Sequence, residues 1–244
     1  MGELIAILSG KGGTGKTSVC AALASALAQE EKSVLCLDCD AGLRNLDIPL
    51  GISDMDALSF TDVASGAYTL SAAVQHPDFP NLRFLTAPVN TTWQNVDEKA
   101  FEKLLLKAKK KYQYVLLDCA SGLGKCFSTA ARLADQCVLV TLSDPASIRG
   151  TARLAEELEK SGIDDVRMIV NRVDVKWFSR RKLTIDDIMD ETGVALLGLV
   201  PEDETVFSAA MSSKPLLIVS KKGAAAACRR IAKRLQGRSE PIGL

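Results

Sequence analysis

Strand-sized apolar runs alternate with helix-patterned segments along the whole chain, and this alternation limits the folds that the sequence can adopt. The runs at 4–8, 114–117 and 136–141 are apolar on both faces, as strands are when helices cover both sides of their sheet. Right-handed helical crossovers join such strands into a doubly wound sheet. We therefore predict the α/β class, with a single doubly wound, mostly parallel sheet and helices on both faces. The other predicted strands are 33–37, 82–86, 167–170 and 196–200.

The segments between these strands carry helix signals. Residues 17–29 are rich in Ala and Leu, residues 98–110 place apolar side chains at i, i+3, i+4 and i+7 with lysines opposite, and residues 146–160 repeat a helical pattern. No Pro/Gly/Ser-rich linker, repeat or low-complexity segment interrupts the alternation. We predict one domain over residues 1–244, with 236–244 as a disordered tail.

Composition excludes several classes of protein. Lys and Arg number 30 and Asp and Glu number 30, so bulk positive charge does not favour nucleic-acid coating. No apolar run approaches the ~18 residues that a membrane span needs, and the first residues do not resemble a signal peptide. The seven cysteines, an odd number, indicate reduced thiols and a cytoplasmic protein. Cys36 and Cys39 are three residues apart on a predicted strand and face opposite sides, so we interpret them as buried rather than as a redox pair.

A glycine-rich loop follows the first strand and precedes the first helix. Its sequence from Gly10 to Thr17 matches G-x-x-x-x-G-K-[ST]. Glycines let backbone N–H groups approach phosphate oxygens, and the N-terminus of the following helix attracts negative charge. Lys16 is expected to reach the β- and γ-phosphates, and the Thr17 hydroxyl to bind Mg²⁺. The predicted nucleotide-binding residues in this loop are Gly10, Lys11, Gly12, Gly13, Thr14, Gly15, Lys16, Thr17 and Ser18.

The loop contains a second lysine, Lys11, directly after its first glycine. With it, the segment resembles the deviant Walker A motif of the MinD/ParA family of P-loop ATPases, whose NTPase fold is of the SIMIBI type. The resemblance implies ATP/ADP and Mg²⁺ as cofactors, ATP hydrolysis with slow intrinsic turnover, and an ATP-dependent homodimer. In that dimer Lys11 crosses to the partner's phosphates, so Lys11, Lys16 and Asp40 are the expected catalytic residues. A group acting in trans in this way can contribute ~10³–10⁵ in rate.

Three aspartates follow predicted strands. Asp38 and Asp40 lie in a segment that resembles the first switch of the family, and Asp118 ends Tyr-Val-Leu-Leu-Asp, the Walker B position. By resemblance, Asp40 positions the attacking water, whereas Asp38 and Asp118, with Thr17, form the expected metal site. In the second switch, Gly122 is expected to donate its N–H to the γ-phosphate.

The second switch departs from the family pattern at two positions. Ala120 replaces the usual proline, and Gly124 stands where an acid is common in the MinD branch. These departures concern the rate of hydrolysis and the response to a partner, not nucleotide binding.

Two further segments fall at predicted strand ends. The family reads adenine at the positions of Asn171 and Arg172, and Pro201, Glu202 and Asp203 resemble the segment that closes over the base. Each segment alone is ordinary turn chemistry. Together, after the correct strands, they predict contacts to adenine.

Within the family, the first switch and residues 200–206 favour the MinD branch, which acts in spatial regulation of cell division. Three alternatives remain: a ParA-like ATPase for DNA partition, an ATPase for metal or Fe–S cofactor maturation, and an ATPase for flagellar placement. Cofactor maturation would need a dimer-bridging pair such as Cys119 and Cys126. The resemblance also implies a protein effector of the MinC or MinE type, although Gly150 stands where an acid often lies near the partner surface.

Two basic segments bear on membrane and DNA contact. Residues 224–235 form an amphipathic pattern that suits either anionic lipid or the last core helix, and 236–244 does not resemble the membrane-targeting helix of the MinD branch. Residues 176–182, Lys-Trp-Phe-Ser-Arg-Arg-Lys, suit either DNA phosphates or packing on the domain or a partner. We expect a cytoplasmic protein, with peripheral contact with the inner face of the plasma membrane as an alternative, and DNA as the less favoured partner.

Overall fold

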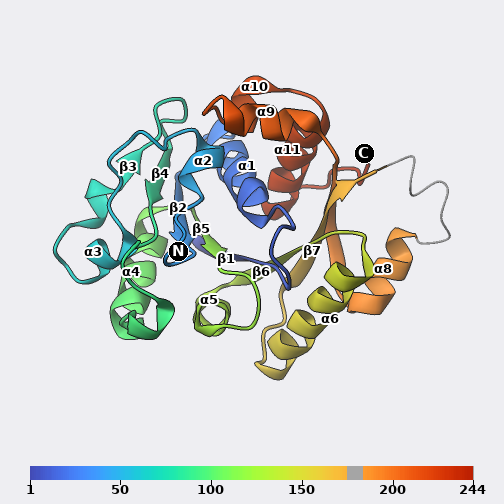
Figure 1. The fold of residues 1–244 in the computed structure, drawn as a ribbon, viewed down its shortest axis with the longest axis horizontal. Helices are drawn as coiled ribbons and strands as arrows, with labels where there is room; N and C mark the ends of the chain where they lie inside the picture. Colours follow the sequence, from blue (N-terminus) through green and yellow to red (C-terminus); the bar gives the residue numbers. More distant parts are fainter. Residues whose placement is uncertain (175–183, 244) are drawn as a thin grey trace.

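The computed structural model describes residues 1–174 and 184–243. In this part of the chain, strands form one sheet of order β3-β4-β2-β5-β1-β6-β7-β8, in which only the edge strand β3 is antiparallel (Figure 1). The α/β fold with a single, mostly parallel sheet is therefore confirmed. The strands are β1 Glu3–Leu8, β2 Val34–Cys39, β3 Val74–Gln75, β4 Leu82–Leu85, β5 Tyr114–Cys119, β6 Gln136–Thr141, β7 Val166–Val173 and β8 Ala195–Pro201.

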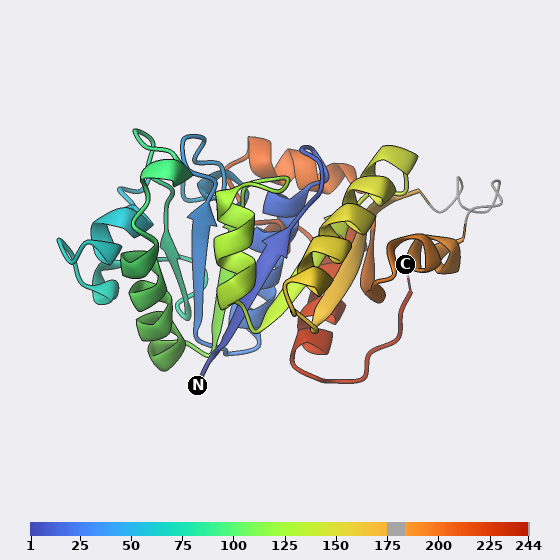
Figure 2. The ribbon, with the colours of Figure 1, turned by 90° about the horizontal axis from the view of Figure 1, so that it is seen from below.

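Helices cover both faces of the sheet. Figure 2 shows α4, α5, α6 and α8 together on one face, whereas α1 and α11 pack with one another and line the other face. The helices are α1 Lys16–Gln29, α2 Asp47–Leu50, α3 Phe60–Ala64, α4 Glu98–Lys111, α5 Lys125–Leu133, α6 Pro145–Lys160, α8 Ile185–Thr192, α9 Glu204–Met211, α10 Leu216–Val219 and α11 Gly223–Leu235, with short 3₁₀ turns at Leu70–Ala72 and Trp93–Asn95.

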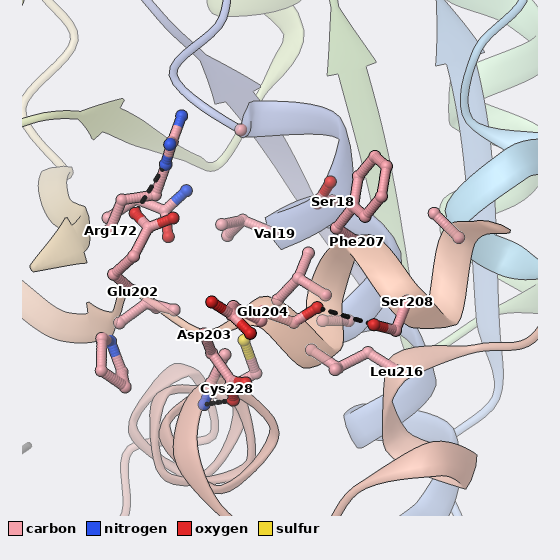
Figure 3. A pocket seen from close by; sticks show the side chains of 18 of the residues that line it. Ser18, Val19, Arg172, Glu202, Asp203, Glu204, Phe207, Ser208, Leu216 and Cys228 are labelled. Carbon is pink, nitrogen blue, oxygen red and sulfur yellow. Dashed lines mark hydrogen bonds and ion pairs between the residues drawn. The ribbon is translucent and has the colours of Figure 1, made fainter.

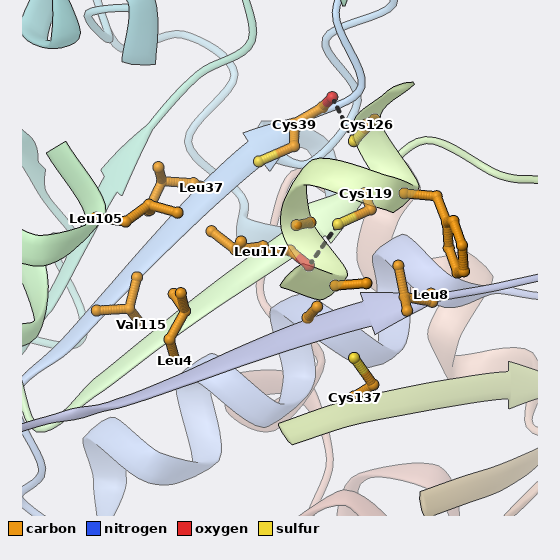
Figure 4. Packing of buried hydrophobic residues seen from close by; sticks show 14 of the residues in the cluster. Leu4, Leu8, Leu37, Cys39, Leu105, Val115, Leu117, Cys119, Cys126 and Cys137 are labelled. Carbon is orange, nitrogen blue, oxygen red and sulfur yellow. Dashed lines mark hydrogen bonds between the residues drawn. The ribbon is translucent and has the colours of Figure 1, made fainter. Parts of the chain in front are cut away.

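The apolar runs of the strands fill two cores, one on each side of the sheet. On β1, Leu4 and Leu8 face the helices α4 to α6, whereas Ile5 and Ile7 face α1 and α11. Figure 4 shows the first of these cores, with Cys39 among its members. Cys36 lies in the opposite core, and all seven cysteines are buried and free. The interpretation of Cys36 and Cys39 as buried residues on opposite faces is confirmed.

The basic C-terminal helix belongs to the core. The apolar face of α11, which includes Ala224, Cys228 and Ile231, is buried against β8 and α1. This face is therefore not free for lipid in the described conformation. In the described residues, no helix is long and apolar enough to cross a membrane.

Two sequence predictions concern segments at the limits of the description. The basic stretch 176–182 lies outside the described residues. The described residues after Gln236 contain no further helix or strand, and the Arg230 guanidinium donates to the Gly243 carbonyl at 2.6 Å. The extent of the domain and the disorder of 236–244 stay predictions.

Candidate nucleotide-binding site

The carboxyl ends of the parallel strands bring the predicted segments together. The glycine-rich loop follows β1, the two switch segments follow β2 and β5, and the two predicted base-contact segments lie at the ends of β7 and β8. Neighbouring strands place Asp38 and Asp118 in register beside one another. In open α/β sheets this edge is where ligands bind.

The glycine-rich loop is shaped by close approaches of neighbouring elements. Gly15 has φ of +83° and directly precedes α1, and a Cβ there would meet Asn171 Nδ2 at 2.3 Å. A Cβ on Gly10 would meet the backbone of Gly150, in α6, at 2.4 Å. Both positions therefore require glycine, because the Cβ of any other residue would displace the neighbouring atoms.

Lys16 forms a buried ion pair at the base of the loop. Its Nζ lies 2.5 Å from Asp118 Oδ1, and both side chains are almost fully buried. Burial alone would lower the pKa of Lys16, but the Asp118 carboxylate more than offsets it, so the pKa of Lys16 is raised. The ammonium is therefore charged at neutral pH, in the loop where phosphate oxygens are expected to bind.

Asp38 holds the first switch in place. Its Oδ1 accepts the N–H of Asp40 at 2.9 Å, and its Oδ2 accepts the N–H groups of Asn45 and Leu46 at 2.9 and 3.0 Å. Burial raises the pKa of Asp38, and these three donors oppose the shift. The carboxylate thus organises its own loop, a role that the sequence does not reveal.

Asp40 and Lys11 lie at the open side of the site. Burial raises the pKa of Asp40, and the Lys16 ammonium opposes this shift. The Lys11 side chain is 51% exposed, and its Nζ lies 3.7 Å from Oδ1 of Asp144, at the N-terminus of α6. An exposed pair at this distance contributes little free energy, so Lys11 is free to exchange partners.

The second switch contacts the loop after β1. Gly122 has φ of +84°, and its N–H donates to the Ser9 carbonyl at 2.9 Å. In this conformation the donor expected to reach a γ-phosphate is already used, so that contact requires the Gly122 loop to move.

A cavity of about 640 Å³ opens beside α1 and is lined by α9, α10, α11 and the ends of β7 and β8 (Figure 3). This volume suits a small-molecule ligand. Eight predicted residues line the cavity: Gly13, Gly15, Ser18, Asn171, Arg172, Pro201, Glu202 and Asp203.

The polar residues of this cavity are tied to the loop and to each other. Asn171 is buried, and its Nδ2 donates to the Thr14 carbonyl at 2.8 Å. Arg172 pairs with Glu202 at 2.7 Å. Asp203 accepts the N–H of Thr205, in the first turn of α9, and its Oδ2 accepts the Ala224 N–H at 2.9 Å. Asp203 therefore fixes the N-termini of α9 and α11 relative to one another.

Several lining residues were not predicted from the sequence. Val19 and Ala22 come from α1, Phe207 from α9 and Leu216 from α10, and Asp144 contacts Lys11 from the start of α6. None belongs to a motif. The one usable signal was the position of Val19 and Ala22, which lie one turn and two turns into the helix that the loop opens.

The residues present fit Mg²⁺ and a nucleotide. Thr14 Oγ1 is buried and has no hydrogen-bond partner in the described structure, and the Thr17 side chain lies close enough to Asp118 to oppose the rise in the pKa of that carboxyl caused by burial. In the described part of the chain no group of three or more His, Cys, Asp or Glu side chains would hold a metal ion. Mg²⁺ is commonly held by one or two carboxylates together with substrate phosphates, and Asp118 and the Thr17 hydroxyl offer oxygen atoms of that kind. Cys119 and Cys126 are both buried, so the described conformation does not offer them as a bridging pair.

The sheet, the glycine-rich loop and the buried Lys16–Asp118 pair define a P-loop nucleotide-binding protein. A family model described as the CobQ/CobB/MinD/ParA nucleotide binding domain matches residues 5–216. The septum site-determining protein MinD of Synechocystis sp. is 32% identical over 99% of this chain and 92% of that protein. The chain therefore belongs to the MinD/ParA family, and its similarity to MinD extends over nearly its whole length.

Solved structures agree with this assignment. MinD in the MinC:MinD cell division protein complex of Aquifex aeolicus superposes with a TM-score of 0.90 at 31% identity, and 99% of each chain is covered. MinD of Pyrococcus horikoshii, complexed with Mg-ADP, superposes with a TM-score of 0.82 at 28% identity, and 96% of each chain is covered. The fold and the family resemblance predicted from the sequence are confirmed.

Proposed function

We propose that this chain is a Mg²⁺-dependent ATPase of the MinD type, an ATP-driven dimerisation switch that acts in placing the division site. The single observation that carries the proposal is the pairing of a buried Lys16–Asp118 ion pair with an exposed second lysine, Lys11, at the same loop. One lysine is fixed within its own subunit, and the other is free to leave it.

The site residues divide into three groups in this proposal. Lys16 and the glycine-rich loop bind the phosphates, and Thr17 and Asp118 hold Mg²⁺, which neutralises phosphate charge when bound. Asp40 orients the attacking water from the loop that Asp38 organises, so Asp38 supports the metal site through that loop. Asn171, which also contacts the loop, faces the base together with the Arg172 and 201–203 segments.

The same geometry supports the proposal of slow turnover in a single subunit. Lys11 pairs with Asp144 of its own chain, and the Gly122 N–H is engaged with Ser9. Neither Lys11 nor the Gly122 N–H can contact the γ-phosphate until its present contact is broken. In the ATP-bound dimer, Lys11 of each subunit reaches the partner's phosphates. Hydrolysis returns the protein to the monomer. The ATP-bound and ADP-bound states therefore expose different surfaces.

A protein effector distinguishes the two nucleotide states by the surfaces that they expose. Since the Aquifex structure is a MinC:MinD complex, we propose a partner of the MinC type and cytoplasmic action, with any membrane contact peripheral. The α11 helix is not assigned to lipid, because its apolar face is buried.

Two lysine variants test the proposal. Lys16→Ala is expected to abolish Mg-ATP binding, because no other buried ammonium is available at the loop in the described structure. Lys11→Ala is expected to bind Mg-ATP but to lose ATP-dependent dimerisation and stimulated hydrolysis. Lys107→Ala, at an exposed position of α4, is the control and should behave as the wild type. Binding is measured by calorimetry and dimerisation by light scattering.

The Lys16→Ala protein needs a folding check. It leaves Asp118 buried without its counter-ion, which typically costs about 3–5 kcal/mol. Circular dichroism therefore accompanies the binding measurement. Unchanged ATP-dependent dimerisation in Lys11→Ala would contradict the role of Lys11 across the dimer.

A further inference from the structure

The cavity beside the phosphate loop has an aromatic side chain at its rim. Phe207 lines the cavity, yet it is 71% exposed. Among the described lining residues it is the single aromatic one. Figure 3 shows that its ring comes from α9, on the side of the cavity opposite Arg172. An apolar ring of this size that remains in water gains free energy when a ligand covers it.

The helix that carries Phe207 is held at its ends and lightly packed between them. Only Ala209 of α9 is buried. Asp203 caps its N-terminus, and at its other end the Lys214 N–H donates to the Ala209 carbonyl at 3.0 Å. An element with few buried apolar contacts can shift at low free-energy cost, and the fixed ends keep Phe207 directed at the cavity.

From these observations we propose that Phe207 closes over the base end of the bound nucleotide and packs its ring on it. The inference rests on the proposed nucleotide-binding function. A ring face interacts with any base, so Phe207 adds affinity for the nucleoside part, whereas the polar groups at Asn171 and at 201–203 distinguish one base from another. The phosphates, held by the loop, do not depend on Phe207.

The same helix supplies a matched control. Met211 follows Phe207 by one turn, is 72% exposed and does not line the cavity. Replacing either residue by alanine removes a comparable exposed apolar side chain from α9. A difference between the two variants therefore reports the cavity and not the stability of the helix.

Calorimetry with two probes tests the inference on the full-length protein: Mg-ADP, and Mg-tripolyphosphate, which has no base or ribose. Phe207→Ala is expected to weaken Mg-ADP binding about tenfold, as removal of a base-stacking aromatic does elsewhere. Phe207→Leu should recover part of the loss, and Met211→Ala should bind Mg-ADP as the wild type does. All four proteins should bind tripolyphosphate equally.

Three results would overturn the inference: wild-type affinity of Phe207→Ala for Mg-ADP, an equal loss in Met211→Ala, or an equal loss for tripolyphosphate. ADP is used so that ATP-dependent dimerisation does not contribute. A wild-type protein that binds neither probe would instead contradict the proposed function itself, and the two failures are thereby distinguishable.

Discussion

At the scale of single residues, the site concentrates carboxylates around one buried ammonium. Asp38 and Asp118 are register neighbours on adjacent strands, and Asp40 lies two residues after Asp38. Burial raises the pKa of all three, and the Lys16 charge opposes this for Asp40 and Asp118. A divalent cation bound here with the phosphates would add positive charge beside these carboxylates.

The chain's one histidine gives a pH prediction away from the site. His76 is buried; its Nε2 donates to the Leu50 carbonyl at 2.7 Å, and its Nδ1 accepts the Asp78 N–H at 3.1 Å. Both bonds suit the neutral ring, and burial lowers the pKa of His76 from its ordinary value of 6.5. Because the unfolded chain then binds the proton more readily, the free energy of unfolding falls as pH drops below about 6.5.

Urea unfolding of the wild type and His76→Gln, at about pH 7.5 and about pH 5.5, checks this. The wild type should lose more free energy of unfolding between the two pH values than the variant, which has no imidazole. Parallel losses in the two proteins would mean that His76 does not carry this pH dependence.

Motifs can predict a phosphate loop because the chemistry of a phosphate cradle fixes both residue type and spacing, and the contacts of this loop to phosphate stay a prediction. The motifs did not predict Asp144 or Phe207, which reach the site from other helices by tertiary packing. Asp38 is the instructive case. The sequence predicts a carboxylate after a strand at 33–37, and the structure places Asp38 within β2. Its hydrogen bonds to three backbone N–H groups depend on the path of the following loop.

At the scale of elements, the contact between the phosphate loop and α6 is made by two glycines and is asymmetric. A Cβ on Gly10 would lie 2.4 Å from the Gly150 backbone, whereas a Cβ on Gly150 would lie 3.4 Å from Gly10. Gly10→Ala is therefore expected to reduce the free energy of unfolding by about 1–3 kcal/mol through overpacking. In Gly150→Ala the added Cβ contacts Gly10, and the cost of this contact is offset by the better helix propensity of Ala, which contributes up to about 1 kcal/mol.

Denaturant unfolding without nucleotide measures this asymmetry, since no ligand then contributes. Gly124→Ala is the control, because its Cβ would meet nothing within 4 Å. Equal destabilisation by Gly10→Ala and Gly150→Ala would contradict the packing described.

The length of a helix or strand determines whether the sequence can predict it. Buried strands such as β6, and the helices α4 and α6, agree with their predicted ranges to within one residue at each end. The two-residue strand β3 and the short helices α2 and α10 were not predicted, because a periodicity cannot be recognised over two to four residues. The α9 helix, which carries Phe207, has eight residues and was not predicted either.

At the scale of the whole molecule, the contact of Lys11 and the contact of the second switch both lie within one chain in the described conformation. Lys11 pairs with Asp144, and Gly122 bonds to Ser9. A dimer around ATP would exchange the first contact for one across the interface and release the second. The proposed switch thus depends on a change in oligomeric state with the bound nucleotide.

Light scattering with size exclusion on the Asp40→Ala protein tests this most directly. Without the carboxylate that we propose positions the attacking water, the ATP state should persist long enough to be measured. We predict a monomer with Mg-ADP and a dimer with Mg-ATP. The same mass with both nucleotides would contradict the role of Lys11 across a dimer, even if the loop binds nucleotide.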